Sequence, residues 1–252
     1  ACAIVSRAGQ KYLALAGDRA ARFAGHDEGG VRLCPLTVEN AQALQALFPY
    51  ARPASHAGHA FTMGLGDRLG LATPGHVRAI AGYGVYPVLA QQSIRELTLT
   101  NRTFADVIAA ATFGVFQEGY KGGYGADGDH LKTKEEIRYA LESGCTMITL
   151  DCSEHIDIHA AASSDAEVDA AYAALPAEVR DHYEAAYLGK ELPVIGQLSA
   201  AELKRIVLVF WKAVRHAESC YRYIDEIKTA DVDFELSIDE TRTITTPAEH
   251  FV

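Results

Sequence analysis

The sequence lacks the cysteine pattern of a disulfide-bonded or zinc-ribbon protein. Its five cysteines are spread along 252 residues, no two form a Cys-x-x-Cys pair, and their number is odd. This usage is typical of reduced thiols in the cytosol, where disulfides are rare. We therefore expect a cytoplasmic protein with neither a disulfide framework nor a zinc ribbon.

Positive charge and long apolar runs are scarce as well. Lys and Arg number 23 against 33 Asp and Glu, which gives a formal net charge of -10. A nucleic-acid backbone or an anionic lipid surface would be repelled overall, and no apolar run approaches the roughly 20 residues of a membrane span. The first residues also lack the pattern of a signal peptide. We expect no nucleic-acid and no membrane partner, whereas a small acidic substrate needs only one or two cations near its carboxylate.

What the sequence does contain is an alternation of strand-like and helix-like segments. Residues 1–55 combine short apolar runs, a Gly29-Gly30 turn and a helical stretch after Thr37, which predicts a small N-terminal α+β cap. In residues 56–252 helices alternate with apolar runs, namely Phe61–Met63, Val85–Ala90, Cys145–Leu150 and Phe234–Ile238. Such alternation is typical of parallel β/α units. Because a closed barrel needs eight strands, we predict an α/β fold with an incomplete TIM-like (β/α) barrel, truncated at its C terminus, and keep an open sheet as the alternative.

The richest segment for chemistry is residues 121–130, Lys-Gly-Gly-Tyr-Gly-Ala-Asp-Gly-Asp-His. Glycines let a backbone approach a ligand, so the segment suits a loop that directs Asp129 and His130 into a pocket. A neutral imidazole binds divalent transition metals, and an adjacent carboxylate can act as a base. An ordinary turn with solvated charges, placed before a helix that begins at Thr133, explains the same residues equally well.

The same segment also matches the dinucleotide fingerprint through Gly123-x-Gly125-x-x-Gly128, with Asp151 after a later apolar strand. That match would indicate an NAD-dependent dehydrogenase. However, residues 106–118 before the glycines have helical periodicity, and the next helix begins only at Thr133. Both features disfavour the strand–turn–helix context that the fingerprint requires.

A second candidate acid is Glu235, in a strand-like segment that alternates polar and apolar residues. Glu235 and Ser237 share one face, while Phe234, Leu236 and Ile238 share the other. With the apolar face against helices, Glu235 would point into the barrel. Burial of an unpaired carboxylate there costs free energy, which favours a functional role over packing. An edge strand with Glu235 in water is the alternative.

Six segments, in order, resemble the tagaturonate/fructuronate epimerase family: residues 66–70, 73–79, 90–96, 114–120, 125–130 and 234–241. The resemblance implies that Asp129 is the proton acceptor, that His130 is a ligand to a divalent metal cation, and that Glu235 is the proton donor. Family members continue past Val252, where further metal ligands are expected, so the chain by itself is expected to be inactive. The family pattern has Ala where this chain has Gly128.

The implied reaction interconverts D-tagaturonate and D-fructuronate, which differ at a carbinol carbon β to the ketone. The ketone acidifies C–H bonds on its α carbon but not on this β carbon, so simple enolisation cannot invert it. Retro-aldol cleavage and direct deprotonation at carbon remain the two routes. We expect the sugar-acid substrate to contact residues near the strand ends: Arg68, Gln91, Gln92, Arg95 and Asp151. The competing classes are the dehydrogenase and a non-catalytic sugar-binding remnant, and the sequence carries no signal for an oligomeric state.

Overall fold

The computed structural model describes residues 1–238 and 244–252, which divide into two compact units. The first unit comprises Ala1–Leu150 and Ile224–Glu235, and the second comprises Asp151–Tyr223 and Leu236–Val252. Asp239 and Glu240, which belong to the last segment of the family resemblance, lie outside the described residues.

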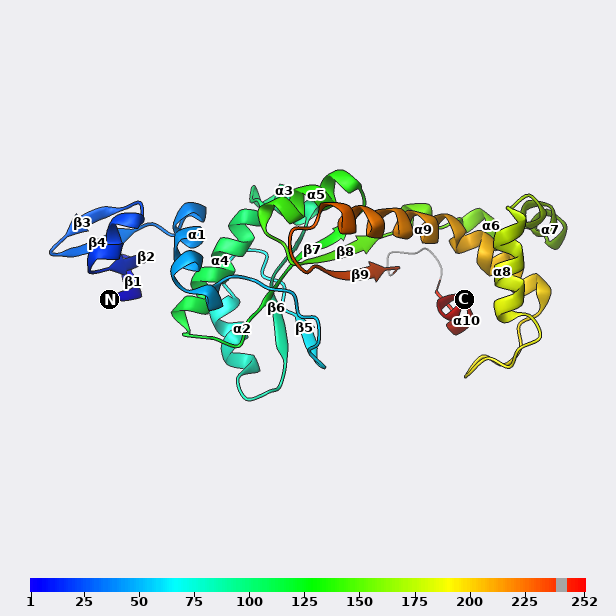
Figure 1. The fold of residues 1–252 in the computed structure, drawn as a ribbon, viewed down its shortest axis with the longest axis horizontal. Coiled ribbons are helices and arrows are strands. Elements are labelled where there is room, and N and C mark those ends of the chain that lie inside the picture. The colour runs from blue at the N-terminus through cyan, green and yellow to red at the C-terminus, as the bar shows by residue number, and fades with distance from the viewer. Residues whose placement is uncertain (239–243) are drawn as a thin grey trace. The chain divides into compact units, whose positions relative to one another are not determined.

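An antiparallel sheet opens the first unit (Figure 1). Its strands are β1 (Cys2–Arg7), β2 (Gln10–Leu15), β3 (His26–Glu28) and β4 (Val31–Cys34), in the order β1-β2-β4-β3. Leu13, Phe23 and Cys34 pack against the helix α1 (Val38–Leu47) and against Phe113 of a later helix. The expected small α+β arrangement is therefore present, while its boundary at residue 55 stays a prediction.

A five-stranded parallel sheet follows. Its strands are β5 (Thr62–Gly64), β6 (Tyr86–Ser93), β7 (Gly125–Leu131), β8 (Met147–Asp151) and β9 (Asp233–Ser237), in sequence order across the sheet. β5 and β9 are the two ends of this order, so the described strands form an open sheet. The α/β class is confirmed, and completion of a TIM-like barrel stays a prediction.

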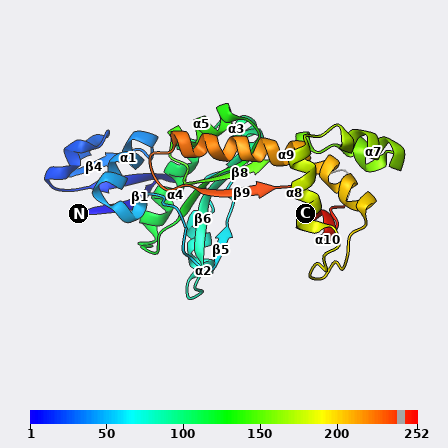
Figure 2. The ribbon, with the colours of Figure 1, turned by 45° about the vertical axis from the view of Figure 1, so that its right-hand side comes forward.

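Four further helices belong to the first unit, and three of them begin at side-chain caps. They are α2 (Thr73–Ile80), α3 (Ile94–Thr100), α4 (Phe104–Gln117) and α5 (Lys134–Ser143). Capping boxes at Ser93, Thr103 and Thr133 open the last three, and Gly144 ends α5 with a φ of 103°. α4 contacts both β1 and β6, so one helix joins the antiparallel and the parallel sheet (Figure 2).

The second unit is mainly helical. It contains α6 (Ile158–Ala162), α7 (Asp165–Ala173), α8 (Ala177–Tyr187), most of α9 (Ala200–Ile227) and α10 (Pro247–Phe251). Tyr172, Leu198, Leu203 and Ile206 form its core. In the part of the chain that the structure describes, no helix has the length and apolar character needed to cross a membrane. Three short 3-10 turns complete the described elements. Asp18–Arg22 and Pro49–Ala51 lie in the first unit, and Ser153–His155 lies in the second.

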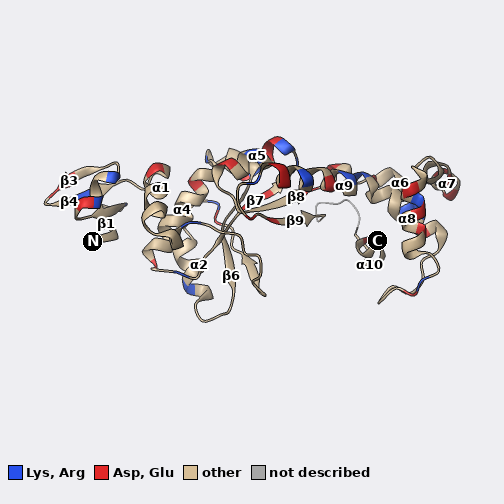
Figure 3. Ribbon diagram, in the orientation of Figure 1, with Lys and Arg blue, Asp and Glu red and all other residues tan. Residues whose placement is uncertain are grey.

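Charge within the parallel sheet is of one sign. β5 and β6 carry no charged residue, whereas β7, β8 and β9 carry only acids (Figure 3). These acids are Asp127, Asp129, Asp151, Asp233 and Glu235. A carboxylate with other carboxylates nearby ionises less readily, so the sheet is the place to look for acid–base chemistry.

Candidate active site

The glycine-rich segment is a strand rather than the expected loop. Gly125–Leu131 forms β7, which pairs in parallel with β6 and places Gln91 opposite Asp127 and Ser93 opposite Asp129. Gly128 lies where β7 packs against α5, and a Cβ atom there would come within 2.9 Å of the Ala140 Cβ. The glycine therefore permits close packing of helix and strand. A dinucleotide-binding turn between a strand and a helix is absent at this segment, so the dehydrogenase interpretation loses its structural basis.

A β-bulge interrupts β7 at its carboxyl end. Between the pairs Gly128↔Ile148 and Leu131↔Leu150, β7 has one residue more than β8. The extra residue falls at Asp129–His130, and His130 has a φ of +53°, in the left-handed region. A bulge locally reorients side chains and is frequent beside active sites, and a left-handed histidine is uncommon. The backbone thus departs from regular strand geometry at the two residues predicted for catalysis and metal binding.

The bulge brings these two neighbours into contact. His130 Nδ1 lies 2.8 Å from Asp129 Oδ1, although adjacent residues of a regular strand point to opposite faces. Both side chains are partly buried, with 28% and 20% exposure. A histidine that donates Nδ1–H to a carboxylate presents its Nε2 lone pair, which is the common arrangement for a metal ligand. In residues 1–238 and 244–252, however, no group of three or more His, Cys, Asp or Glu side chains could hold a metal ion. The role of His130 as a metal ligand stays a prediction.

Asp127 is the most perturbed acid of the sheet. Its side chain is almost completely buried, and its Oδ2 accepts hydrogen bonds from Gln91 Nε2 (3.2 Å) and Thr149 Oγ1 (3.0 Å). Burial, and to a lesser extent the charge of Asp129, raise the pKa of Asp127 to about 7. The two hydrogen bonds lower this pKa, but by less than burial raises it. The charge of Glu235 raises this pKa as well. Asp127, Asp129 and Glu235 therefore lie close enough to influence one another.

Glu235 is exposed in the middle of β9, while Ser237 is buried. Its carboxylate acts electrostatically on Asp127, so it is near the acids of β7 rather than isolated in solvent. Because Glu235 is exposed, it does not pay the desolvation cost expected of a carboxylate that points into a barrel. Its role as proton donor stays a prediction.

The two neighbouring glutamines lie on opposite faces of β6. Gln91 reaches Asp127, whereas Gln92 is fully buried and its Nε2 donates to the Asp67 backbone carbonyl at 2.9 Å. Gln92 therefore holds the loop before α2, and its predicted contact with substrate has no support in this arrangement. Gln91 keeps its place beside the acids.

Two arginines approach one buried acid near the end of β6. Arg68 Nη2 lies 2.9 Å, and Arg95 Nη2 3.6 Å, from Glu96 Oε1, and both arginine side chains are largely exposed. Glu96 also completes the capping box of α3. A substrate carboxylate at this rim would compete with Glu96 for the guanidinium groups. Binding by Arg68 or Arg95 stays a prediction.

Asp151, the last residue of β8, belongs to the second unit. It is buried, and its Oδ1 accepts a hydrogen bond from the Ser153 backbone N–H at 2.8 Å. This bond gives Asp151 a local role in starting the next turn. Its predicted contact with substrate is untested.

Sequence reasoning missed Asp127 and Thr149. The signal is present in the alternation of β7, because Asp127 and Asp129 are two positions apart, with one residue between them, and so share a face of a regular strand. The glycines of this segment favour a loop, which conceals the periodicity. Thr149 could be recognised only through its contact with Asp127 across two strands.

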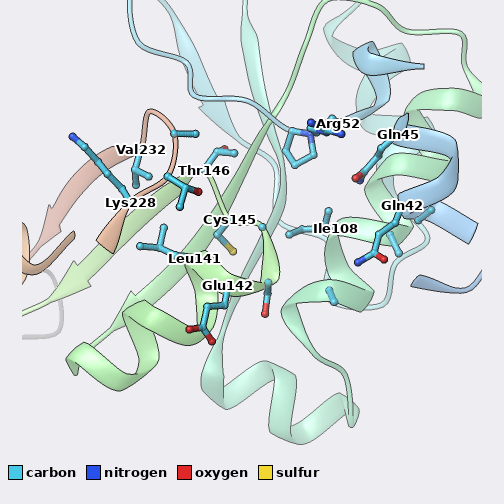
Figure 4. Close-up of a pocket in the computed structure, with 18 of the residues that line it drawn as sticks. Gln42, Gln45, Arg52, Ile108, Leu141, Glu142, Cys145, Thr146, Lys228 and Val232 are labelled. Carbon is cyan, nitrogen blue, oxygen red and sulfur yellow. The ribbon is translucent and has the colours of Figure 1, made fainter. Parts of the chain in front are cut away.

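The first unit also has a cavity of about 610 Å³ at the opposite ends of the strands. Figure 4 shows Arg52, Cys145, Thr146 and Val232 around it, and these residues precede β5, β8 and β9. In parallel β/α folds this amino-terminal side serves stability, whereas active sites occur at the carboxyl ends. The cavity is therefore distinct from the acidic site on β7.

Fold and sequence define a class: an α/β protein whose parallel strands β7, β8 and β9 carry acidic side chains. A family model described as UxaE, tagaturonate epimerase, matches residues 2–252. The chain belongs to the tagaturonate epimerase family.

Relatives agree with this assignment. A tagaturonate/fructuronate epimerase of Thermotoga maritima is 38% identical over 249 residues, which cover 95% of this chain and 51% of that protein. The native crystal structure of fructuronate-tagaturonate epimerase UxaE from Cohnella laeviribosi superposes with a TM-score of 0.93 at 47% identity, covering 99% of this chain and 52% of that one. A complex of the same enzyme with one glycerol gives a TM-score of 0.94. The chain spans about half the length of these relatives.

Proposed function

We propose that the protein containing this chain interconverts D-tagaturonate and D-fructuronate, and that Asp129 and Glu235 transfer the protons. The observation that supports the proposal is the contact between His130 and Asp129, together with the electrostatic effect of Asp129 and Glu235 on buried Asp127, within a family of epimerases. The location of such an enzyme in the cytoplasm stays a prediction from the composition.

In the retro-aldol route, Asp129 accepts the proton of the hydroxyl group on the carbinol carbon β to the ketone. The C–C bond to the neighbouring α carbon then breaks, its electron pair passes toward the ketone, and the carbinol carbon becomes an aldehyde. After rotation the aldehyde is attacked on its other face, and Glu235 donates a proton to the new alkoxide. A divalent cation held in part by His130 would supply Lewis-acid stabilisation of negative charge on oxygen.

The substrate carboxylate needs a cation, and the first unit offers two at the rim. Arg68 and Arg95 project their exposed guanidinium groups beside Glu96, which suits bidentate recognition of a carboxylate. Gln91 adds an amide that can bind a sugar hydroxyl. A non-catalytic sugar-binding remnant would share these contacts but show no turnover.

Three substitutions in the full-length protein test the assignment. Asp129→Asn and Glu235→Gln should keep bound metal and lower kcat by about 100- to 10,000-fold, because amides preserve shape but cannot transfer the proton. His130→Ala should lose metal and activity together. Epimerisation of tagaturonate and metal content would be measured on the same samples.

Asp169→Asn, at an exposed ion pair with Lys204, is the matched control and should change neither quantity. Full activity after chelation, or a requirement for added NAD, would refute the proposed reaction. A wild-type protein that binds the sugar acid without turnover would establish the remnant instead.

A further inference from the structure

Asp127 has a carboxyl group whose two oxygens differ in environment. Oδ2 accepts both hydrogen bonds, from Gln91 and Thr149, and both donors are uncharged. Among the described residues, Oδ1 is buried without any hydrogen-bond partner. An ionised carboxylate here would leave one charged oxygen bare, which is among the most costly arrangements in a protein interior.

Among residues 1–238 and 244–252, the titratable groups that act on Asp127 are acids and a thiol. The titratable groups that act on Asp127 are Asp129 on its own strand and Glu235 on β9, and its charge in turn raises the pKa of the buried Cys145 thiol, which burial raises most. β6 and β8 contribute the uncharged Gln91 and Thr149. A proton on Asp127 removes the repulsion from every one of these groups.

Asp127 also holds the Gln91 side chain in place. The Gln91 amide nitrogen donates to Asp127 Oδ2. On its other side, a Cβ atom at Gly64 would come within 2.7 Å of Gln91 Oε1, so the missing side chain at position 64 makes room for this amide. Asp127 and Gly64 together fix an amide that lies beside the predicted proton acceptor.

We propose that Asp127 is a positioning residue of the acid–base site: as a neutral carboxylic acid it holds Gln91 in place and adds no negative charge beside Asp129 and Glu235. The proposal rests on the proposed function of those two residues. When Asp127 ionises, a further negative charge enters the site, hinders loss of the proton that Asp129 must accept and pass on, and repels an anionic substrate. Turnover should therefore fall as the pH rises through the midpoint of Asp127.

The protonation state can be measured without any assay of activity. In the protein labelled with ¹³C at aspartate carboxyl groups, one resonance should titrate near pH 7 and be missing from Asp127→Asn. Thr149→Val should move this midpoint to higher pH, because the lost hydrogen bond favours the charged form. Asp169→Asn should leave the resonance unchanged. A resonance of Asp127 that titrates near pH 4 would overturn the proposal.

Kinetics test the consequence. Asp127→Asn imitates the neutral acid, so at pH 6 its kcat should stay within about threefold of the wild type, while its activity should persist to higher pH. Asp127→Ala releases Gln91 and should lower kcat by roughly 10- to 100-fold. An unchanged pH profile in Asp127→Asn, or a loss as deep as that of Asp129→Asn, would contradict a positioning role. Absence of turnover in a wild type whose Asp127 titrates near pH 7 would instead refute the proposed function.

Discussion

At the scale of single residues, two buried aspartates show how the surroundings decide the charge of the same side chain. Asp67 accepts five backbone N–H groups, from Leu69 through Thr73, at 2.6 to 3.3 Å. Burial raises its pKa, but the hydrogen bonds from these amides outweigh burial and hold the pKa below the usual value. Asp127 receives no such amides, and its pKa rises to about 7. Hydrogen-bond donors, rather than depth alone, separate a structural carboxylate from a proton-holding one.

Asp67 should accordingly stabilise the fold in a pH-dependent way. Its lowered pKa contributes stability above the unfolded value of 3.8, and this contribution is lost as the pH falls through the folded value. Asp67→Asn places an NH₂ group against backbone N–H donors and should cost about 2 to 4 kcal/mol at pH 7, with a smaller cost at pH 3. Urea unfolding followed by circular dichroism at both pH values measures the difference. Equal unfolding midpoints of the wild type and Asp67→Asn at pH 7 would show that the charge of Asp67 does not stabilise the backbone N–H groups around it.

At the scale of elements, β7 shows how one strand combines close packing with an irregular end. Gly128 allows α5 to approach, and the bulge after it directs Asp129 and His130. Ala140 Cβ and Leu131 Cδ1 would both lie 2.9 Å from a Cβ atom added at Gly128. Side chains of α5 and β7 therefore fill the space that an alanine would occupy.

Gly128→Ala should therefore destabilise the first unit by about 1 to 3 kcal/mol, because overpacking forces helix and strand apart. Gly75→Ala in α2 is the matched control, since nothing lies within 4 Å of an added Cβ there. Its exposed helical position should gain roughly 0.5 to 1 kcal/mol. Thermal unfolding of both variants checks the pair. A Gly128→Ala protein as stable as Gly75→Ala would mean that α5 moves at little cost.

At the scale of the whole molecule, the open parallel sheet leaves apolar side chains in solvent. β5 is an end strand whose three residues are all exposed, and Phe61 and Met63 are 72% and 49% accessible. The end strand β5 therefore presents an exposed edge with apolar surface. Unpaired backbone groups beside apolar side chains favour association between copies, so limited solubility is the expected consequence.

A charge on this edge should reduce association. Met63→Lys places a cation on an end strand, a device by which natural sheets prevent edge pairing, and should lower concentration-dependent light scattering with little effect on unfolding temperature. Val194→Lys, at a fully exposed residue in the second unit, is the control and should change scattering less. Equal effects of both variants would attribute the improvement to net charge rather than to the edge.

The sequence by itself determined what depends on neighbours along the chain. Capping residues such as Thr103 and Thr133 and the stop at Gly144 were readable because a cap is a local hydrogen bond or a local φ preference. Alternating strands and helices likewise determined the α/β class, and local motifs selected Asp129 and His130.

Only the tertiary structure decided what depends on pairing between strands. The burial of Asp127, the bulge at Asp129–His130 and the separation of Gln91 from Gln92 all follow from the register of β6, β7 and β8. A one-residue change of register inverts every side chain of a strand, and the glycines of β7 give no local preference that fixes it. The pKa of Asp127 follows from that register, because its donors come from two different strands.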